Sequence, residues 1–247
     1  MRKLKNNPPI NFVTYTNNSG NKKLKKWLDF YTENKSKYAA YTHNDPGFEH
    51  TIKNLKYTWD NDGQREPTIL ANYQDLSSRY HFEEHPQFLR FGFFHLEKSR
   101  EGNEAYPSFF TRLIEEKVYD KNEIISVIGF LTKSEVLWDQ QYNDQGDYTG
   151  YTTEAGYGIG DYWKEYFRGI KNLKKAKTSD LTLFRLNNAN SPYNEPHPDL
   201  IEVKLFLKKS NGKQLQGMST LDFLDYAVLI SDSKASTPIE ELELISK

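Results

Sequence analysis

Two continuous apolar runs set the strongest conditions on the fold. The segment Ile124–Leu131 (IISVIGFL) has the length of a strand, and an unbroken apolar run of this length is typical of a parallel strand that is covered on both faces. The segment Phe88–Leu96 (FLRFGFFHL) has the same character and contains one glycine, where another backbone can approach closely. We therefore predict that both segments are buried strands.

Helical segments alternate with these runs. Leu24, Trp27, Leu28 and Tyr31 occur at i, i+3, i+4 and i+7, which places them on one apolar stripe of a helix. Strands that alternate with helices favour βαβ units, so the sequence predicts an α/β fold with a mainly parallel sheet flanked by helices. Further helices are expected at 48–59, 67–82 and 109–114, and further strands at 181–186 and 226–231, with 200–207 open to either.

A polar segment, 139–163, interrupts this pattern. It contains five Gly and five Tyr residues and no Lys or Arg. Such a composition is unsuited to a core element, so we expect a polar insertion that forms a loop or a hairpin. No internal repeat or linker divides the sequence, and we predict one α/β domain over residues 1–247.

The composition excludes several classes of protein. The chain has no cysteine, which excludes disulfides, a thiol nucleophile and a thiolate metal site. The formal net charge of -1 argues against a dedicated nucleic-acid binder, because such proteins concentrate Lys and Arg against phosphate. The basic residues that gather in the first quarter of the chain lack interleaved aromatic rings, so we interpret them as a solvated helix face.

The sequence also carries no signal for membranes or export. No run approaches the roughly 20 apolar residues that span a bilayer. Residues 1–12 contain Asn-Asn-Pro-Pro where a secretory signal has an apolar stretch. We therefore expect no transmembrane segment. The compartment stays open, with the cytoplasm as the default and an extracytoplasmic location as the alternative if the chain is a truncated piece.

The sequence HFEEH at residues 81–85 fits the H-x-x-E-H pattern, in which two histidines of one helix bind zinc and a glutamate activates water. In this chain those residues are His81, Glu84 and His85. Pro86 follows at once and biases His85 away from helical geometry. We interpret the segment as the polar end of a helix and expect no metal, with a zinc hydrolase as the less favoured alternative.

His95 stands at the end of the apolar run that begins at Phe88. In open α/β sheets ligands gather at the carboxyl ends of strands, so this position favours a functional histidine. A neutral imidazole there can act as a general base, a hydrogen-bond donor or a metal ligand. The alternative is a histidine that is hydrogen-bonded to a neighbouring backbone group.

Arg65 and Glu66 precede the helix that opens at Pro67, and Asn72 lies within that helix. An Arg–Glu pair at the start of a helix is commonly an exposed ion pair that contributes little to stability. A functional interpretation requires this end of the helix to face the same cleft as His95. The pair does not establish that arrangement by itself.

Tyrosines of the polar insertion are candidates for ligand contacts. Tyr148, Tyr151 and Tyr157 present rigid amphipathic rings, which suit a sugar, a macrocycle or another flat ligand. The alternative, which we favour for most of these rings, is a hairpin whose tyrosines pack on the surface. The glycines of this segment form no phosphate loop, and the sequence has no G-x-S-x-G elbow.

Three segments taken in order resemble the erythromycin esterase-like family, which shares a superfamily with haem-binding iron-uptake lipoproteins. They are REPTILANYQDL at 65–76, FLRFGFFHLEK at 88–98 and YPSFFTRL at 106–113, and they are followed by the strand at Ile124. The resemblance covers about residues 60–135. The C-terminal sequence LDFLDYAVLISDSKASTPIEEL is also similar to the last strand of that family.

The resemblance implies hydrolysis of an ester or lactone by water that a histidine activates. By this analogy His95 is an active-site histidine, Arg65 binds or polarises the substrate, Glu66 is the acidic partner and Asn72 contacts the substrate. No cofactor is implied. The Gly-Glu-x-x-His-type motif of the family's first strand is absent, so the chain looks like the C-terminal portion of such a protein.

Activity of the chain on its own is therefore left open, and so is its oligomeric state. The alternative function is a non-catalytic domain that binds a small molecule or carbohydrate through the Tyr-rich segment. The sequence names neither the substrate nor that ligand.

Overall fold

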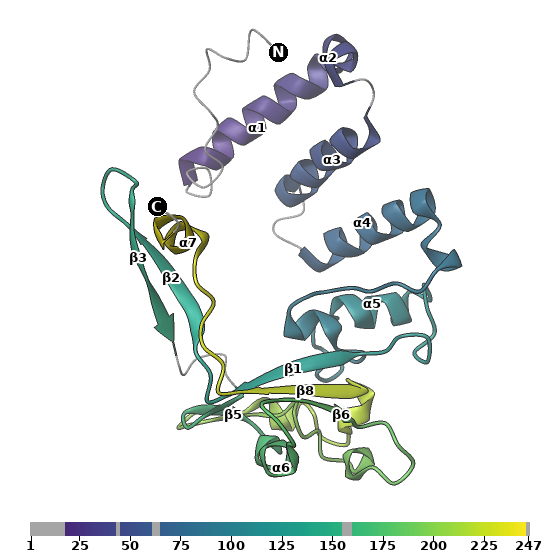
Figure 1. The fold of residues 1–247 in the computed structure, drawn as a ribbon. Helices are drawn as coiled ribbons and strands as arrows, with labels where there is room; N and C mark the ends of the chain where they lie inside the picture. The colour runs from purple at the N-terminus through teal and green to yellow at the C-terminus, as the bar shows by residue number, and fades with distance from the viewer. Residues whose placement is uncertain (1–17, 43–44, 61–64, 155–159, 246–247) are drawn as a thin grey trace. The chain divides into compact units, whose positions relative to one another are not determined.

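The computed structural model describes residues 18–42, 45–60, 65–154 and 160–245 (Figure 1). Contacts divide the chain into two compact units, residues 1–86 and 87–247, and each unit is described by itself. The organisation as a single domain stays a prediction. Tyr157 lies outside the described residues.

The first unit is helical. It contains α1 (Asn18–Glu33), α2 (Lys35–Thr42), α3 (Pro46–Asp60), α4 (Arg65–Tyr80) and the 3-10 helix η3 (Phe82–Glu84). The apolar stripe of α1 supplies Leu28 and Tyr31 to a small core, where they pack with Ile52 of α3. The Tyr31 hydroxyl donates a hydrogen bond of 2.8 Å to Glu49, which also links α1 to α3. The helices predicted from periodicity in this part of the chain are confirmed.

The second unit is built around a three-stranded sheet with the order β1-β8-β6. Its strands are β1 (Val127–Thr132), β8 (Tyr226–Ser231) and β6 (Leu181–Arg185). β1 and β8 are parallel, and β6 is antiparallel to β8. Each of these strands coincides closely with one that the sequence predicts.

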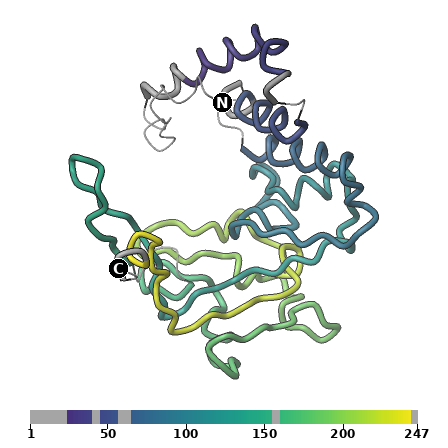
Figure 2. Tube along the Cα trace, turned by 45° about the horizontal axis from the view of Figure 1, so that its top comes forward, coloured from purple at the N-terminus to yellow at the C-terminus, as the bar shows by residue number. Residues whose placement is uncertain are grey.

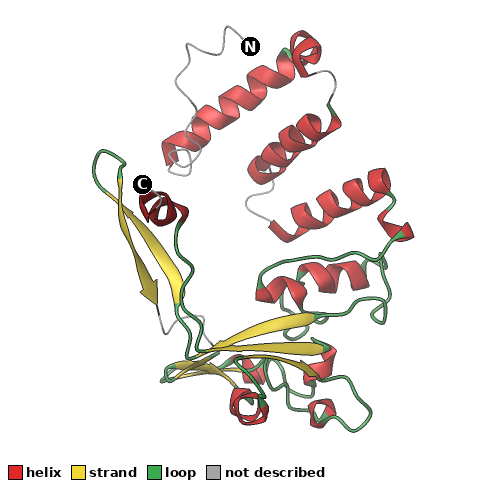
Figure 3. Cartoon of the chain, viewed as in Figure 1, coloured by secondary structure: helices red, strands yellow, loops and turns green. Residues whose placement is uncertain are grey.

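The second unit contains further helices and strands besides this sheet (Figure 3). Two smaller sheets are antiparallel: the hairpin β2–β3, and a sheet with the order β4-β5-β7. In chain order these elements are η4 (Phe93–Leu96), α5 (Phe109–Glu115), β2 (Val136–Tyr142), β3 (Tyr148–Glu154), β4 (Asp161–Tyr162), β5 (Glu165–Phe167), α6 (Ile170–Ala176), η5 (Pro192–Asn194), β7 (Val203–Leu205), η6 (Asn211–Lys213), η7 (Thr220–Asp222) and α7 (Ile239–Ile245).

The prediction of a mainly parallel sheet flanked by helices is wrong. β1 and β8 form the only parallel pair among the described strands, and the sheets have two or three strands each. Between these two strands the chain folds back as hairpins and short antiparallel strands, with α6 as the one α-helix of the described residues in that interval. The polar composition of the insertion explains part of this, because β2 and β3 form a separate hairpin instead of joining the sheet.

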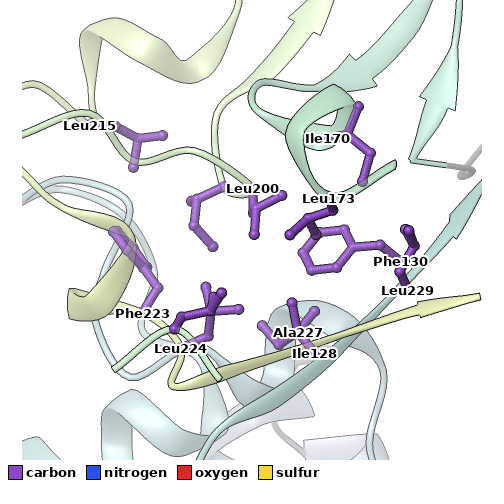
Figure 4. Close-up of a cluster of buried hydrophobic side chains, with 12 residues drawn as sticks. Ile128, Phe130, Ile170, Leu173, Leu200, Leu215, Phe223, Leu224, Ala227 and Leu229 are labelled. Atoms are coloured by element: carbon purple, nitrogen blue, oxygen red, sulfur yellow. The ribbon is translucent and has the colours of Figure 1, made fainter. Parts of the chain in front are cut away.

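The core of the second unit lies on one face of the β1-β8-β6 sheet. Alternate residues of β1 and β8, which include Ile128, Phe130 and Leu229, point into it, and the side chains of α6 pack on them (Figure 4). The tube trace shows β1 and β8 running side by side in the second unit (Figure 2). On this face Ile128, Phe130, Ala227 and Leu229 are completely buried.

The predicted strand at Phe88–Leu96 is wrong. The side chain of Phe88 is 92% exposed, and the chain turns at Gly92 into η4, where the His95 amide donates to the Gly92 carbonyl at 3.1 Å. The ring of Phe93 packs against Phe130 and Phe167, at 5.4 and 5.1 Å from their centroids. These aromatic contacts fix a turn of helix where the sequence indicated a strand.

No helix among the described residues combines the length and the apolar character needed to cross a membrane. The expectation of no transmembrane segment agrees with this finding.

The core position of Phe130 gives a test of the fold. We expect Phe130→Ala to lower the free energy of unfolding by about 3–5 kcal/mol, because it removes a buried ring and leaves a cavity. Phe94→Ala, at a ring that is 62% exposed, is the matched control and should change that free energy by only about 0.5 kcal/mol. Urea denaturation measures both values, and equal effects of the two substitutions would contradict the packing described.

Candidate functional site

Helices α3 and α4 form a polar seam in the first unit. The Arg79 guanidinium donates to the carbonyl of Pro46 at 3.3 Å, and His50 meets Asp75 farther along the same pair of helices. In both contacts a residue late in α4 meets one early in α3, so the two helices run antiparallel. We call the residues His50, Asp75 and Asn72 the α3–α4 seam.

His50 and Asp75 make the best-defined acid–base pair of this seam. The distance from His50 Nδ1 to Asp75 Oδ2 is 2.9 Å, and the imidazole is only 14% exposed. Asp75 is also held by Arg79 at 3.1 Å and lies 4.0 Å from Lys53. The hydrogen bond with His50 is the main reason why the pKa of Asp75 lies below its usual value.

This arrangement fixes the orientation of the imidazole. A carboxylate on Nδ1 selects the tautomer and leaves Nε2 as the nitrogen that can exchange a proton with a ligand or with water. Such a pair has two possible roles, an interhelical ion pair or the base of a hydrolytic site. Sequence reasoning missed His50, because nothing in a single sequence joins residues 50 and 75.

The predicted residues Arg65, Glu66 and Asn72 all lie on α4. Arg65 is exposed, whereas Glu66 and Asn72 are half-buried. The side-chain oxygen Oδ1 of Asn72 is shielded from solvent and accepts no hydrogen bond from the described residues. Asn72 and Asp75 are three residues apart on one helix, so they are neighbours on its surface.

The structure places His95 differently from the prediction. It belongs to η4 in the second unit, and its ring packs against Phe91 with the centroids 5.8 Å apart. The carbonyl of the next residue, Leu96, accepts a hydrogen bond of 2.6 Å from Ser126, immediately before β1. His95 therefore lies near the amino end of β1, whereas the prediction placed it at the carboxyl end of a strand.

Glu97, two residues beyond His95, is a buried carboxyl group. Its side chain is 4% exposed, and Oε1 accepts no hydrogen bond from the described residues. Burial raises its pKa to about 9, and the nearby charge of Glu101 acts in the same direction. Glu97 is thus protonated at neutral pH. No sequence pattern distinguishes it from an ordinary surface glutamate.

The residue that follows, Lys98, forms a buried ion pair with Asp225. The ammonium group lies 2.8 and 2.7 Å from the two carboxylate oxygens, and it also donates to the carbonyl of Ile124 at 3.3 Å. The backbone amide of Ser126 donates to the same carboxylate at 2.8 Å. All the polar groups of this pair have partners, which indicates a structural role.

The H-x-x-E-H segment does not form the helical zinc pattern. Helix α4 ends at Tyr80, His81 has a positive φ of 52° and His85 is extended. The two imidazoles therefore do not lie on one helix. A different set, the side chains of His81, Glu83 and Glu84, has ligand atoms within 4.8 Å of one another, but all three residues are exposed.

The candidate residues Tyr148 and Tyr151 of the insertion lie on the β2–β3 hairpin. The Tyr148 hydroxyl donates to Glu241 of α7 at 3.0 Å, and Tyr151 is the register partner of Gln140. Burial and the carboxylates of α7 raise the pKa of Tyr148 to about 12. The Tyr148 hydroxyl therefore helps to hold α7 against the hairpin.

Comparison with known proteins adds no assignment. No family model matches the chain, no curated protein matches it and no solved structure matches it. The resemblance to the erythromycin esterase-like family accordingly stays a prediction.

The buried carboxyl of Glu97 predicts a pH dependence of stability. Below about pH 4.5 the carboxyl group is protonated in both the folded and the unfolded chain, so it does not change the free energy of unfolding. At higher pH the unfolded chain releases the proton while the folded chain keeps it up to about pH 9. The free energy of unfolding therefore falls as pH rises, by about 1.4 kcal/mol per pH unit between the pKa of the unfolded chain and that of the folded chain.

We expect Glu97→Gln to remove this loss, because the amide mimics the protonated acid and cannot ionise. Urea denaturation at about pH 5 and about pH 8 measures the effect, and the variant should be more stable than the unmodified chain at the higher pH. Glu104→Gln, at an exposed glutamate of the same loop region, is the control. An identical pH dependence in all three proteins would refute the assignment.

Proposed function

We propose that the protein hydrolyses an ester or lactone with water that His50 activates. The observation that carries this proposal is the hydrogen bond between His50 Nδ1 and Asp75, whose carboxylate is in turn held by Arg79. A base oriented by a carboxylate is the arrangement that general-base hydrolysis requires. The resemblance of the segment at 65–76 to the erythromycin esterase-like family supports the same reaction class.

The chemistry uses residues of α3 and α4. Nε2 of His50 takes a proton from water as the water oxygen bonds to the carbonyl carbon of the substrate. Asp75 stabilises the imidazolium that results, because its carboxylate lies 2.9 Å from Nδ1. When the carbon–oxygen bond to the leaving group breaks, the imidazolium returns the proton to the alkoxide.

The resemblance implies roles for other residues of α4. Asn72, the substrate contact that the resemblance implies, is half-buried and lies one helical turn from Asp75. Arg65, exposed in the first turn of α4, lies roughly 15 Å along the helix from Asp75, so it is suited to bind a part of the substrate away from the reacting carbonyl. Glu66 beside it is the acidic partner in the proposal.

His95 remains a separate proposal for the base, and it belongs to the second unit. Binding of a small molecule or carbohydrate without catalysis is the alternative function. The hairpin favours that alternative less, because the Tyr148 hydroxyl already donates to Glu241.

The test is turnover of a panel of chromogenic esters and lactones by the full chain. We expect His50→Gln to lower kcat by about 10²–10⁴-fold, because the amide keeps a hydrogen bond to Asp75 but cannot accept the proton. Asp75→Asn should also lower kcat, since it leaves the imidazole without its carboxylate. His85→Gln, at an exposed histidine of the same unit, is the matched control and should retain full activity.

Circular dichroism and thermal unfolding of each variant separate loss of activity from loss of fold. Turnover that survives His50→Gln and disappears in His95→Ala would show that the general base is His95 of the second unit and not His50. Absence of turnover by the unmodified chain on every substrate would overturn the hydrolase proposal and favour the binding function.

A further inference from the structure

Two neighbouring turns of the second unit carry large apolar side chains in solvent. The first is the two-residue turn of Trp163 and Lys164, which joins β4 to β5. The second follows β7 directly and contains Phe206 and Leu207. The amide of Phe206 donates to the carbonyl of Lys164 at 2.8 Å, so the two turns lie side by side.

The three apolar side chains of these turns are exposed together. Trp163 is 60% exposed, Phe206 is 55% exposed and Leu207 is 89% exposed. The ring centroids of Trp163 and Phe206 are 5.4 Å apart. Single exposed apolar residues are common on protein surfaces, but large ones that gather in one place mark an interaction site. We call Trp163, Phe206 and Leu207 the apolar tip.

The backbone of Leu207 holds its side chain in water at a cost. Its φ of 60° lies in the left-handed region, which disfavours a residue with a Cβ atom. Because the side chain is exposed, burial within this chain does not offset that cost. Strained backbone positions of this kind cluster where ligands bind.

Lysines flank the apolar tip. The Lys164 ammonium group lies 4.9 Å from the centroid of the Trp163 ring, and Lys208 and Lys209 follow Leu207 on exposed chain. Among the residues that the structure describes, no carboxylate forms an ion pair with any of these three lysines. Their positive charges are therefore available to an anionic partner.

The acidic groups nearby do not neutralise these lysines. Asp161, at the start of β4, pairs with Lys174, and Glu202, just before β7, pairs with Lys204. Glu165, which follows the first turn, is half-buried in β5. The two turns thus carry three lysines against one glutamate, next to an apolar surface.

We propose that the apolar tip docks the protein on an anionic membrane surface. Trp163, Phe206 and Leu207 enter the boundary between lipid headgroups and acyl chains, where aromatic rings are favoured. The ammonium groups of the lysines then lie at the level of the anionic headgroups. A fluid bilayer accepts side chains that project from turns and needs no matching cavity. This binding is peripheral, and none of these residues belongs to the proposed hydrolytic site of the first unit.

Co-sedimentation of the full chain with lipid vesicles tests the proposal. We expect binding to mixed vesicles of phosphatidylcholine and phosphatidylserine, and much weaker binding to phosphatidylcholine alone. Each lysine near an anionic surface strengthens binding by about fivefold. Added salt should weaken the binding, because it screens exposed charges.

Leu207→Asn separates membrane binding from folding. Asparagine adopts the left-handed region more readily than leucine, so this variant should unfold at the same or a higher temperature than the unmodified chain. Its affinity for mixed vesicles should nevertheless fall by about tenfold or more, because an apolar side chain no longer leaves water. Thermal unfolding and co-sedimentation measure the two effects.

A charge reversal tests the lysines. Lys208→Glu should weaken binding to mixed vesicles by about fivefold or more. Lys117→Glu, at an exposed lysine that follows α5, is the matched control with the same change of net charge and should bind as the unmodified chain does.

Tryptophan fluorescence shows whether the tip enters the lipid. Mixed vesicles should shift the emission of the chain to shorter wavelength, and Trp163→Phe should remove this shift, although three other tryptophans remain. No binding to mixed vesicles overturns the proposal, as does binding that survives both Leu207→Asn and Lys208→Glu. Retention on heparin that Leu207→Asn leaves unchanged, without vesicle binding, would assign the lysines to a soluble polyanion and overturn it equally.

Discussion

The ion pair between Lys98 and Asp225 is the interaction on which the second unit depends. The carboxylate of Asp225 accepts from Lys98 and from the Ser126 amide, and its backbone carbonyl accepts from the amide of Leu186. One residue thus fixes the start of β1, the start of β8 and the end of β6. Burial of two charges is costly, and loss of either partner would leave the other charge without compensation. The pair therefore specifies register more than it adds stability.

Helices and strands that depend on local pattern were predictable from the sequence. The stripe that contains Leu28 and Tyr31 predicts α1, and the run at Ile124 predicts β1, because periodicity and apolar character act over a few residues. Phe88–Leu96 has the same apolar character and became a turn with η4, since Phe93 packs against Phe130 and Phe167. Those partners are distant in sequence, and no local pattern reveals them. The parallel sheet failed as a prediction for the same reason.

The same distinction between local pattern and distant contacts separates the candidate residues that were predicted from those that were not. Asn72 was predicted by resemblance, and it lies one helical turn from Asp75. His50 was not predicted, because its partner Asp75 lies 25 positions away and only the antiparallel packing of α3 and α4 brings the two together. Glu97 was missed because burial, which raises its pKa, is a property of the folded chain. Burial and neighbouring groups set the pKa of a titratable residue. A single sequence shows where such a residue is in the chain, but not which groups surround it in the fold.

The run at Ile124–Leu131 places apolar residues on both faces of β1, whereas one buried face needs them only at every second position. Ile128 and Phe130 are buried in the core, but Val127 and Leu131 point to the other side of the sheet. An unbroken run indicates that both faces of a strand are covered, and the described residues bury only one of them completely. The local pattern thus predicts the burial of Ile128 and Phe130, but it does not reveal that the fold has no mainly parallel sheet to cover the outward residues.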